Sequence, residues 1–579
     1  MKKEIDLIKS LSVISVVIML LGVIMCAPFG VSAAETYGDF EYSVNDDNTC
    51  AITKYNGSDS NLSIPSELQG HKVTAIDNST FEDYADLTSI TVPDSVTGIG
   101  NEVFIICENL TSITVDKNNS VYSSADGVLF DKTQDILITC PIGKTGDYRI
   151  PDGVTDIEEL AFYNCKNLTS VIIPDSVTNI GDWGFCGCTG LTDFTVPNGV
   201  TSIGNAVFVG CSGLKNITIP DNVTSIGSST FDSCTSLISV TIPDSVEIIS
   251  DFAFYGCTGL TGITIPDSVT SIGDDAFGGC TDLTCITVDK NNSVYSSADG
   301  VLFDKTQDIL ITCPIGKTGD YRIPDGVTGV GKLAFHNCVY LKSIIIPESV
   351  TRINERAFYG CTGLTGITIP ESITSIGCAT FDGCTSLTDI TIPDSVTSID
   401  MAAFNGCTGL TGIIIPDSVT SVGKGAFYNC TSLTSIKVPN GVTSIEDYTF
   451  YGCTGLTGIT IPSNVTSIGK HAFIGCGNLT IYGQENSYAQ EYADGHGIPF
   501  AVSGNKFFGD ADGDGKITVD DATLIRKAVV GVATLDADQR VLADVDGDGK
   551  VTVSDVTMIQ KYIAGGYANT GLVGKIANV

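Results

Sequence analysis

The sequence predicts a mainly β protein, built as a repeat solenoid and followed by a small α-helical domain at the C-terminus. Two observations support this prediction. Prolines recur every 23 residues, from Pro151 to Pro266 and again from Pro324 to Pro462, and a fixed period of this size is the signature of a solenoid. The chain then ends with two copies of one acidic loop, and each copy runs into an amphipathic segment.

Residues 1–33 have the composition of a secretory signal peptide. Three lysines flank or precede the apolar run 11–27, and residues 31–34 supply a small-residue cleavage pattern. We therefore expect a secreted, extracellular mature chain. One alternative is an uncleaved membrane anchor, for which the run is short. Another is a lipoprotein modified at Cys26, which Met25 disfavours.

The chain is strongly acidic, with Lys+Arg 30 against Asp+Glu 67 and a formal net charge of −37 at pH 7. Such a charge argues against binding to nucleic acid and against docking on anionic lipid. Beyond the N-terminal run, no apolar stretch reaches the length that crosses a bilayer. We therefore expect no membrane span in the mature chain.

The repeat unit is well represented by residues 257–280, CTGLTGITIPDSVTSIGDDAFGGC. Alternating isoleucines predict a short strand with its apolar side inward, and Pro266 ends that strand because it lacks an N–H donor. Gly273 is expected where the chain turns with a positive φ, and Phe277 is expected to fill the core. One coil cannot bury its own apolar side, so stacked coils must share a continuous core.

Two insertions of 35 residues interrupt the series, near residues 116–150 and 289–323. They lie in stretches that are identical over 43 residues, which a segmental duplication explains. Apolar clusters at 128–130 and 136–138 predict a hairpin that extends the coil.

Fourteen of the 21 cysteines share one repeat position. They are Cys107, Cys165, Cys188, Cys211, Cys234, Cys257, Cys280, Cys338, Cys361, Cys384, Cys407, Cys430, Cys453 and Cys476. Cysteines in a secreted protein suggest disulfides. Equivalent cysteines on adjacent coils, however, have Cβ atoms about 4.8 Å apart, a separation longer than a disulfide allows. We therefore expect a column of buried, reduced thiols. Cys186, Cys285 and Cys378 lie off this column, and their redox state stays open.

The residue after the repeat proline is Asp or Glu in most coils. Stacked carboxylates could bind a cation, but the preferred interpretation is a turn in which the Asp side chain bonds to backbone two residues on. Asn198, Asn440 and Ser463 stand at the same position and keep only that turn role. The outward strand positions are mostly Thr, Ser and Gly, with Phe194 as the exception, so protein binding has an edge over glycan binding on this face.

No arrangement of residues predicts catalysis. The four histidines occupy unrelated or variable repeat positions, and neither Gly-x-Ser-x-Gly nor His-Glu-x-x-His occurs. We place no active site and expect a protein that is not an enzyme.

Each terminal loop has the pattern of a calcium loop, with oxygen ligands at positions 1, 3, 5, 7, 9 and 12 and glycine at position 6. The candidate ligands, with the lysines offering backbone carbonyls, are Asp510, Asp512, Asp514, Lys516, Thr518, Asp521, Asp544, Asp546, Asp548, Lys550, Thr552 and Asp555. Two Ca²⁺ ions are therefore expected, and their binding should contribute folding energy. Position 12 is Asp, whereas ordinary EF-hands have Glu, so the pair differs from calmodulin-like hands.

The two segments after the loops correspond residue by residue. Leu524, Ile525, Ala528 and Val529 match Met558, Ile559, Tyr562 and Ile563, and the spacing predicts one apolar helical face in each segment.

The repeat Cys-x-x-Leu-x-x-Ile-x-Ile-Pro-x-x-Val-x-x-Ile-Gly-x-x-Ala-Phe resembles the BspA-like leucine-rich repeats of bacterial surface and secreted proteins. The likeness covers about residues 37–502, and residues 479–502 look like the helical cap of that family. For function, this resemblance implies a binding surface and nothing more specific.

The duplicated loop-plus-helix units resemble the type I dockerin domain over about residues 505–567. That resemblance implies docking to a cohesin module of a scaffoldin, as in cellulosomes. The implied contact residues are Val519, Asp520, Arg526 and Lys527, with Val553, Ser554, Gln560 and Lys561 as the symmetric set. Asp520 against Ser554 and Arg526 against Gln560 break the symmetry that would allow equal use of two orientations.

These patterns divide the chain into a signal peptide at 1–33, a solenoid at 34–502 and a dockerin at 503–579. The preferred hypothesis is a non-catalytic secreted component of a cellulosome-like complex, linked to polysaccharide catabolism. Its dockerin binds a scaffoldin cohesin, and its solenoid binds a protein or a plant cell-wall polysaccharide. The alternatives are a surface adhesin that binds host or neighbouring cells, and a glycoside-hydrolase-type enzyme with an unrecognised site.

Overall fold

The protein is a mainly β solenoid of repeats spaced by about 23 residues, with a small helical C-terminal region, as the sequence predicts. The computed structural model describes residues 35–78, 80–81, 84, 86–502, 506–513, 516–565, 571–574 and 576–577. The predicted signal peptide, residues 1–33, lies outside the described residues. No helix within the described part of the chain is long and apolar enough to cross a membrane.

The chain forms two compact units, Met1–Cys234 and Thr235–Val579, so the division falls inside the repeat array. The first unit opens with a sheet in which β1 (Glu35–Tyr37), β2 (Phe40–Val44) and β3 (Thr49–Tyr55) run antiparallel. This entry sheet buries apolar side chains such as Tyr42 at the first end of the core.

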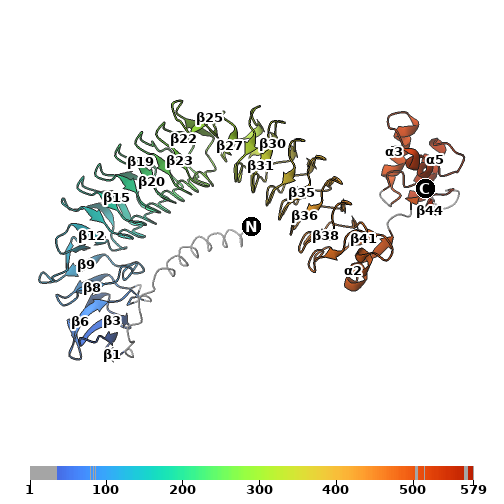
Figure 1. The fold of residues 1–579 in the computed structure, drawn as a ribbon. Coiled ribbons are helices and arrows are strands. Elements are labelled where there is room, and N and C mark those ends of the chain that lie inside the picture. The colour runs from blue at the N-terminus through green and yellow to red at the C-terminus, as the bar shows by residue number, and fades with distance from the viewer. Residues whose placement is uncertain are drawn as a thin grey trace. The chain divides into compact units, whose positions relative to one another are not determined.

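A coil of the second unit shows how the repeat folds. Strand β22 (Gly262–Ile265) pairs in parallel with β24 (Cys285–Val288) of the next coil. A turn follows, closed by the Val269 N–H donating to the Pro266 carbonyl over 3.4 Å, and β23 (Ser271–Ile272) begins the next side. Because successive coils pair in this way, each unit grows by adding strands to its sheets (Figure 1).

Apart from the antiparallel pair of Glu67–Leu68 with His71–Ile76, the remaining strands of the first unit outside the insertion repeat this parallel pairing. They are β4 (Asn61–Ser63), β5 (Glu67–Leu68), β6 (His71–Ile76), β7 (Ser89–Val92), β8 (Gly98–Ile99), β9 (Ser112–Val115), β13 (Gly146–Arg149), β14 (Asp156–Ile157), β15 (Leu168–Ile172), β16 (Asn179–Ile180), β17 (Asp193–Thr195), β18 (Ser202–Ile203), β19 (Asn216–Thr218) and β20 (Ser225–Ile226).

The second unit has the corresponding set. It comprises β21 (Ile248–Ile249), β28 (Gly319–Arg322), β29 (Gly329–Val330), β30 (Leu341–Ile345), β31 (Arg352–Ile353), β32 (Gly366–Thr368), β33 (Ser375–Ile376), β34 (Asp389–Thr391), β35 (Ser398–Ile399), β36 (Ser421–Val422), β37 (Ser435–Lys437), β38 (Ser444–Ile445), β39 (Gly458–Thr460), β40 (Ser467–Ile468), β41 (Thr480–Gly483) and β42 (Phe500–Val502). A helix, α2 (Tyr488–His496), lies in the predicted cap and buries Tyr492 and Ala493 against the last coils.

The core of each unit contains a column of stacked phenylalanines. Phe358 and Phe381, for example, stack with ring centroids 5.3 Å apart and planes 3° apart. The predicted cysteine column runs beside them, and its thiols bond to the coil before. The Cys384 Sγ donates to the Phe358 carbonyl over 3.2 Å. The 20 cysteines of the described residues are all free thiols, and burial raises the pKa of column members such as Cys384.

The structure corrects the predicted role of the repeat glycine. Gly273 does not adopt a positive φ, and the left-handed glycine of this coil is Gly279, with φ 69°. A Cβ atom at Gly273 would lie 2.3 Å from the backbone nitrogen of Asp251 in the preceding coil. This glycine therefore permits the close approach of two coils, which the sequence of a single coil does not reveal.

Two further expectations about the solenoid surface were wrong. Phe194 is 3% exposed, because it takes the inward position of the strand and packs edge-on against Phe185 and Phe208. The Asp after Pro174 also acts differently from the prediction, because the Val177 N–H closes that turn by donating to the Pro174 carbonyl over 3.1 Å. The Asp175 Oδ1 accepts instead from the Asn198 N–H of the next coil over 3.4 Å.

Each insertion forms the predicted hairpin and one strand more. In the first unit β11 (Val128–Asp131) and β12 (Ile136–Thr139) pair antiparallel, and β10 (Tyr122–Ala125) adds to β11. In the second unit β25 (Tyr295–Ala298), β26 (Val301–Asp304) and β27 (Ile309–Thr312) repeat this meander.

One asparagine in each insertion closes the preceding coil. Asn292 is fully buried, and its Nδ2 donates to the Pro266 and Val269 carbonyls over 2.8 and 2.9 Å. Its Oδ1 accepts from the Val294 and Tyr295 N–H groups over 2.9 and 2.7 Å. Asn119 makes the equivalent bonds in the first insertion.

The C-terminal region begins and ends with one short antiparallel pair, β43 (Lys506–Phe507) and β44 (Ile576–Ala577). Between them lie α3 (Val519–Val529), α4 (Ala537–Ala543) and α5 (Val553–Ile563). Strand β43 directly precedes the first loop, so no helix enters that loop, as expected.

Candidate metal centre and docking surface

Helices α3 and α5 begin with the same local structure, which fixes the end of each acidic loop. The side chain of Thr518 caps α3, and Asp521 completes a capping box with the Thr518 backbone. Thr552 and Asp555 do the same at the start of α5. Such boxes satisfy N–H groups that a helix leaves open at its first turn.

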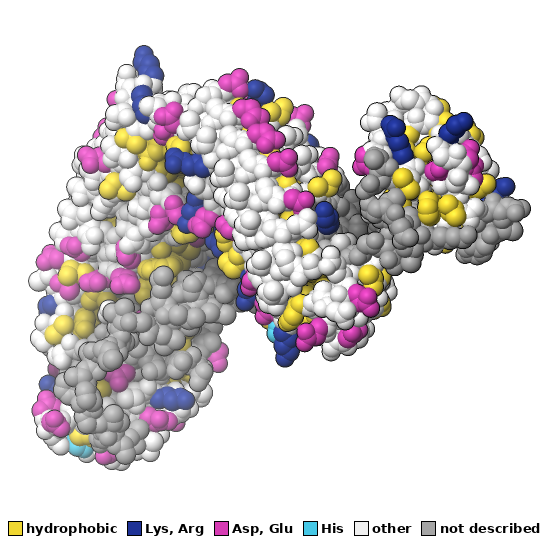
Figure 2. All heavy atoms as spheres, turned by 45° about the vertical axis from the view of Figure 1, so that its right-hand side comes forward, with side chains coloured by type: hydrophobic (Ala, Val, Ile, Leu, Met, Phe, Trp, Pro, Cys, Tyr) yellow, Lys and Arg dark blue, Asp and Glu magenta, His cyan; other side chains and the backbone are white. Residues whose placement is uncertain are grey.

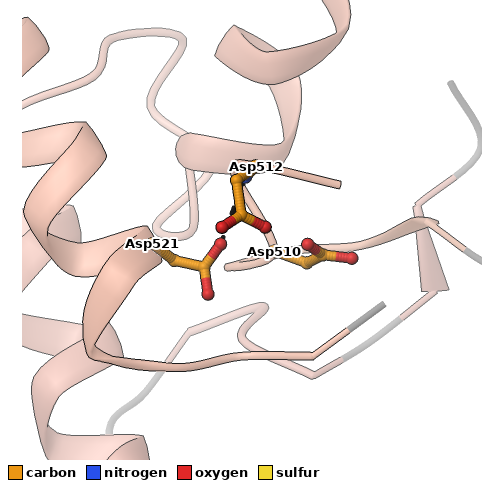
Figure 3. Close-up of side chains that lie close together, drawn as sticks. All are labelled: Asp510, Asp512 and Asp521. Atoms are coloured by element: carbon orange, nitrogen blue, oxygen red, sulfur yellow. Dashed lines mark hydrogen bonds between the residues drawn. The ribbon is translucent and has the colours of Figure 1, made fainter. Parts of the chain in front are cut away.

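Asp521 and Asp555 also bond back to the start of their own loops. The Asp521 Oδ1 accepts from the Ala511 and Asp512 N–H groups over 2.9 and 3.1 Å, and its Oδ2 accepts from the Thr518 N–H over 2.7 Å. Figure 3 shows Asp521 extending from α3 toward the backbone of Asp512. Asp521 and Asp555 are fully buried, so each one ties loop and helix together from inside the domain.

The second loop folds around Asp544. Its Oδ1 accepts from the Gly547 and Asp548 N–H groups over 2.9 and 3.1 Å, and its Oδ2 accepts from the Gly549 N–H over 2.8 Å. The Asp548 carboxylate is held by the Lys550 N–H over 2.8 Å. These backbone bonds fix the positions of two of the carboxylates that are the predicted ligands of the second loop.

The structure brings two sets of the predicted ligands together. Asp510, Asp512 and Asp521 form one set, and Asp544, Asp546 and Asp548 form the other, each with ligand oxygens within 4.8 Å of one another. Several carboxylates this close repel one another unless a cation lies between them. The donor set, all hard oxygens, fits Ca²⁺. Asp555 is not a member of the second set, and Asp514 lies outside the described residues.

The two helices pack against each other through one small core. Its buried members on α3 and α5 include Ile525 and Ile559, each fully buried, as the predicted helical faces require. Ile563 differs from the prediction because it is 36% exposed and does not join this core. Its neighbour Tyr562, in the same last turn of α5, does pack against this core, so Ile563 lies on the side of the turn that faces away from it.

All eight residues of the implied cohesin surface are exposed. Val519 and Val553, at the N-termini of α3 and α5, are 63% and 64% exposed. Arg526 and Lys527 lie in the last turn of α3, where Gln560 and Lys561 stand on α5.

The family model described as "BspA type Leucine rich repeat region (6 copies)" matches this chain. The matched residues are 55–136, 144–258, 224–309, 317–419 and 374–490. These ranges cover more than half of the chain. The chain belongs to the BspA type leucine-rich repeat family. A second family model, described as "Dockerin type I domain", matches residues 508–564. This BspA type protein therefore carries a dockerin at its C-terminus. Type I dockerins bind calcium.

Solved structures of bacterial leucine-rich repeat proteins are similar to this chain. A leucine-rich cell surface protein from Faecalibacterium prausnitzii is 29% identical, covering 81% of this chain and 98% of its own, with a TM-score of 0.38. Proteins from Eubacterium ventriosum and Bacteroides ovatus are 23% and 24% identical, over 77% and 81% of this chain and 94% and 99% of theirs, with TM-scores of 0.39 and 0.34. A comparison with curated proteins finds no significant match.

The solenoid surface holds two contacts that the sequence did not reveal. The His336 Nδ1 forms a hydrogen bond with Asp275 over 3.1 Å, although the second insertion separates the two residues in the sequence. The His471 Nδ1 forms one with Asp447 over 3.1 Å. Acidic side chains are spread over the visible face of the coils without forming one patch (Figure 2). The two partners of each pair lie in different coils. The sequence could have indicated these contacts only if the repeat positions had been compared between stacked coils.

Proposed function

We propose that this protein is a secreted, non-catalytic component of a cellulosome-like complex. Its dockerin, residues 503–579, attaches the chain to a cohesin module of a scaffoldin, and its solenoid, residues 34–502, serves as the binding module. The single observation that carries the proposal is the pair of matching loop-and-helix units, each with clustered carboxylates and an exposed helix start.

Two Ca²⁺ ions complete the docking domain in this proposal. The ligand sets are those of the two loops, led by Asp510 and Asp544 at position 1. Bound calcium supplies positive charge where the carboxylates crowd, which stabilises the folded domain. Asp521 and Asp555 hold each loop against its helix through hydrogen bonds from the loop backbone. The loops thereby fix the start of α3 and α5, where the exposed valines stand.

The cohesin surface comprises two related faces. One is formed by Val519, Asp520, Arg526 and Lys527, and the other by Val553, Ser554, Gln560 and Lys561. The α3 face offers one carboxylate and two cations, whereas the α5 face offers a single cation. Charge differences of this kind change association rate and salt dependence. We therefore propose that a given cohesin prefers one orientation.

The test is binding of the full chain to a panel of immobilised type I cohesins in calcium. The double variant Arg526→Ala/Lys527→Ala is compared with Gln560→Ala/Lys561→Ala. We expect one double variant to lose at least tenfold in affinity and the other to lose less than threefold. Binding of both variants at wild-type affinity to every cohesin that captures the wild type would refute this surface. Failure of the wild type to bind any cohesin would weaken the docking proposal itself.

A further inference from the structure

Four rings form one cluster on the last coils of the second unit, Tyr428, Tyr448, Tyr451 and His471, here called the aromatic cluster. Tyr428 and Tyr451 stack with centroids 4.9 Å apart and planes 6° apart. Tyr448 and His471 stack at 5.0 Å and 8°. Tyr448 and Tyr451 meet at 5.7 Å and 56°, which joins the two stacks. All four side chains are half-buried, so the cluster is a surface whose rotamers are already fixed.

The backbone at Tyr448 follows the rule of the repeat. Tyr448 has φ 63°, and residues at the same repeat position are also left-handed in other coils, among them Trp183, Phe252 and Arg356. Gly425 holds this position in the preceding coil, also at φ 63°. The repeat therefore sets the backbone from which the Tyr448 ring extends.

Polar groups extend the cluster along the solenoid. The residue that follows the core phenylalanine is Tyr428 in one coil, and Asn405 and Asp382 in the two coils before it. The Asn405 Nδ2 donates to the Asp382 Oδ1 over 2.9 Å, and burial raises the pKa of Asp382. The row continues to Tyr359 and His336, whose rings lie 5.5 Å apart.

This post-phenylalanine row therefore places one aromatic or hydrogen-bonding side chain on each of six consecutive coils, between Gly278 and Ile474 at the same position. Its members are His336, Tyr359, Asp382, Asn405, Tyr428 and Tyr451. Successive coils are related by the strand spacing of about 4.8 Å, and the printed ring separations within the row are 5.5 Å for His336 and Tyr359 and 4.9 Å for Tyr428 and Tyr451. A linear polymer with a repeating unit matches such an array better than a compact partner does.

Charge limits the ligand further. Lys424 lies 5.2 Å from the centre of the Tyr448 ring, while His471 and His336 are each hydrogen-bonded to an aspartate. Lys424 and the two histidines thus each face a ring or a carboxylate, although the chain as a whole carries −37. An acidic polymer would be repelled by that total charge. A polymer rich in hydroxyl groups and C–H faces, without charge, suits paired charges, amides and aromatic rings.

We infer that the post-phenylalanine row and the aromatic cluster bind a linear, neutral polysaccharide across several coils. The rings contact the apolar C–H surface of the sugars, and Asp382 and Asn405 bond to hydroxyl groups. Because the stacked rings hold one another in place, little side-chain entropy is lost on binding. This inference rests on the proposed function in taking the solenoid as a binding module, and it names the ligand class.

The test uses the full chain and a triple variant, Tyr428→Asn/Tyr448→Gly/Tyr451→Asn. Each substitution introduces a residue that another coil of the second unit already has at the same position, Asn405 or Gly425, so the fold accommodates it. Tyr340→Asn is the matched control, because Tyr340 is 47% exposed but lies outside the row. Retardation is measured in native gels that contain hydroxyethyl cellulose, xylan or glucomannan, with polygalacturonate as the acidic polymer and calcium present throughout.

We expect at least one neutral polymer to retard the wild type and Tyr340→Asn, and the triple variant to bind it at least tenfold more weakly. Three results would overturn the inference: no retardation by any neutral polymer, equal retardation of the triple variant, or retardation by polygalacturonate alone. Capture on the cohesin panel is measured in parallel. A triple variant that loses retardation but keeps cohesin capture supports the sugar site, and a wild type that shows retardation without cohesin capture contradicts only the docking proposal.

Discussion

The substitution Asp555→Asn tests whether one buried carboxylate holds the second loop to its helix. Asp555 is fully buried, and its Oδ1 accepts from the Val545 and Asp546 N–H groups over 2.9 and 3.2 Å. Its Oδ2 accepts from the N–H and the Oγ1 of Thr552 over 2.8 and 3.2 Å. Asparagine has almost the same volume and can keep the first pair of bonds. Its NH₂ group would face the Thr552 N–H, so two donors would meet inside the domain.

The expected loss follows from these bonds. Hydrogen bonds to a charged group contribute about 1.5–3 kcal/mol each, and a buried group left unsatisfied costs a similar amount. Loss of the bonds at Thr552 should therefore destabilise the docking domain by roughly 2–4 kcal/mol. At about 1.4 kcal/mol per factor of ten, amide protection in α5 should fall by about 30-fold to 1000-fold.

The measurement is hydrogen exchange by mass spectrometry on the full chain in saturating calcium. Peptides that cover α5 report the loss, and peptides from the phenylalanine column of the solenoid serve as an internal reference that should not change. Thr557→Ala is the control, because Thr557 is exposed in the middle of α5. A change of less than threefold in α5 for Asp555→Asn would refute the role given to this carboxylate.

Three further predictions concern the solenoid. Gly273→Ala should lower its free energy of unfolding by about 1–3 kcal/mol, because the new Cβ has no room, whereas Gly412→Ala, with no atom within 4 Å of the new Cβ, should change it little. Asn292→Ala should cost about 3 kcal/mol through buried groups left unsatisfied, and exposed Asn291 is the control; urea midpoints measure all four variants, and equal midpoints within either pair would contradict the packing described. Maleimide should label exposed Cys285 in the native chain and reach the buried members of the column, which exclude the half-buried Cys476, only after unfolding, so rapid native labelling of those buried members would be inconsistent with their burial.

The repeat itself could be predicted because each coil carries its full pattern in 23 residues. Strand, proline turn, core phenylalanine and cysteine column are all local or follow from stacking. Gly273 and Phe194 were misjudged because their roles depend on the neighbouring coil. The sequence of one coil does not show that a Cβ would meet the coil before, or which side of a strand faces inward when its pattern shifts.

The candidate site divides in the same way. The ligand positions of the loops are fixed by spacing within one loop, so the sequence predicted them as a set. The bonds from the loop backbone to Asp521 depend on how the loop closes, and spacing alone does not give that geometry. The aromatic cluster was missed because Tyr448 meets Tyr451 within its coil and His471 of the next coil, and these contacts depend on side-chain directions that spacing alone does not give.

Calorimetric titration of a type I cohesin into the full chain tests the central claim most directly. The account predicts binding of one cohesin per chain in calcium, and no heat of binding when excess chelator is present. Equal binding in calcium and in chelator would contradict the claim that the paired acidic loops form the docking domain around calcium.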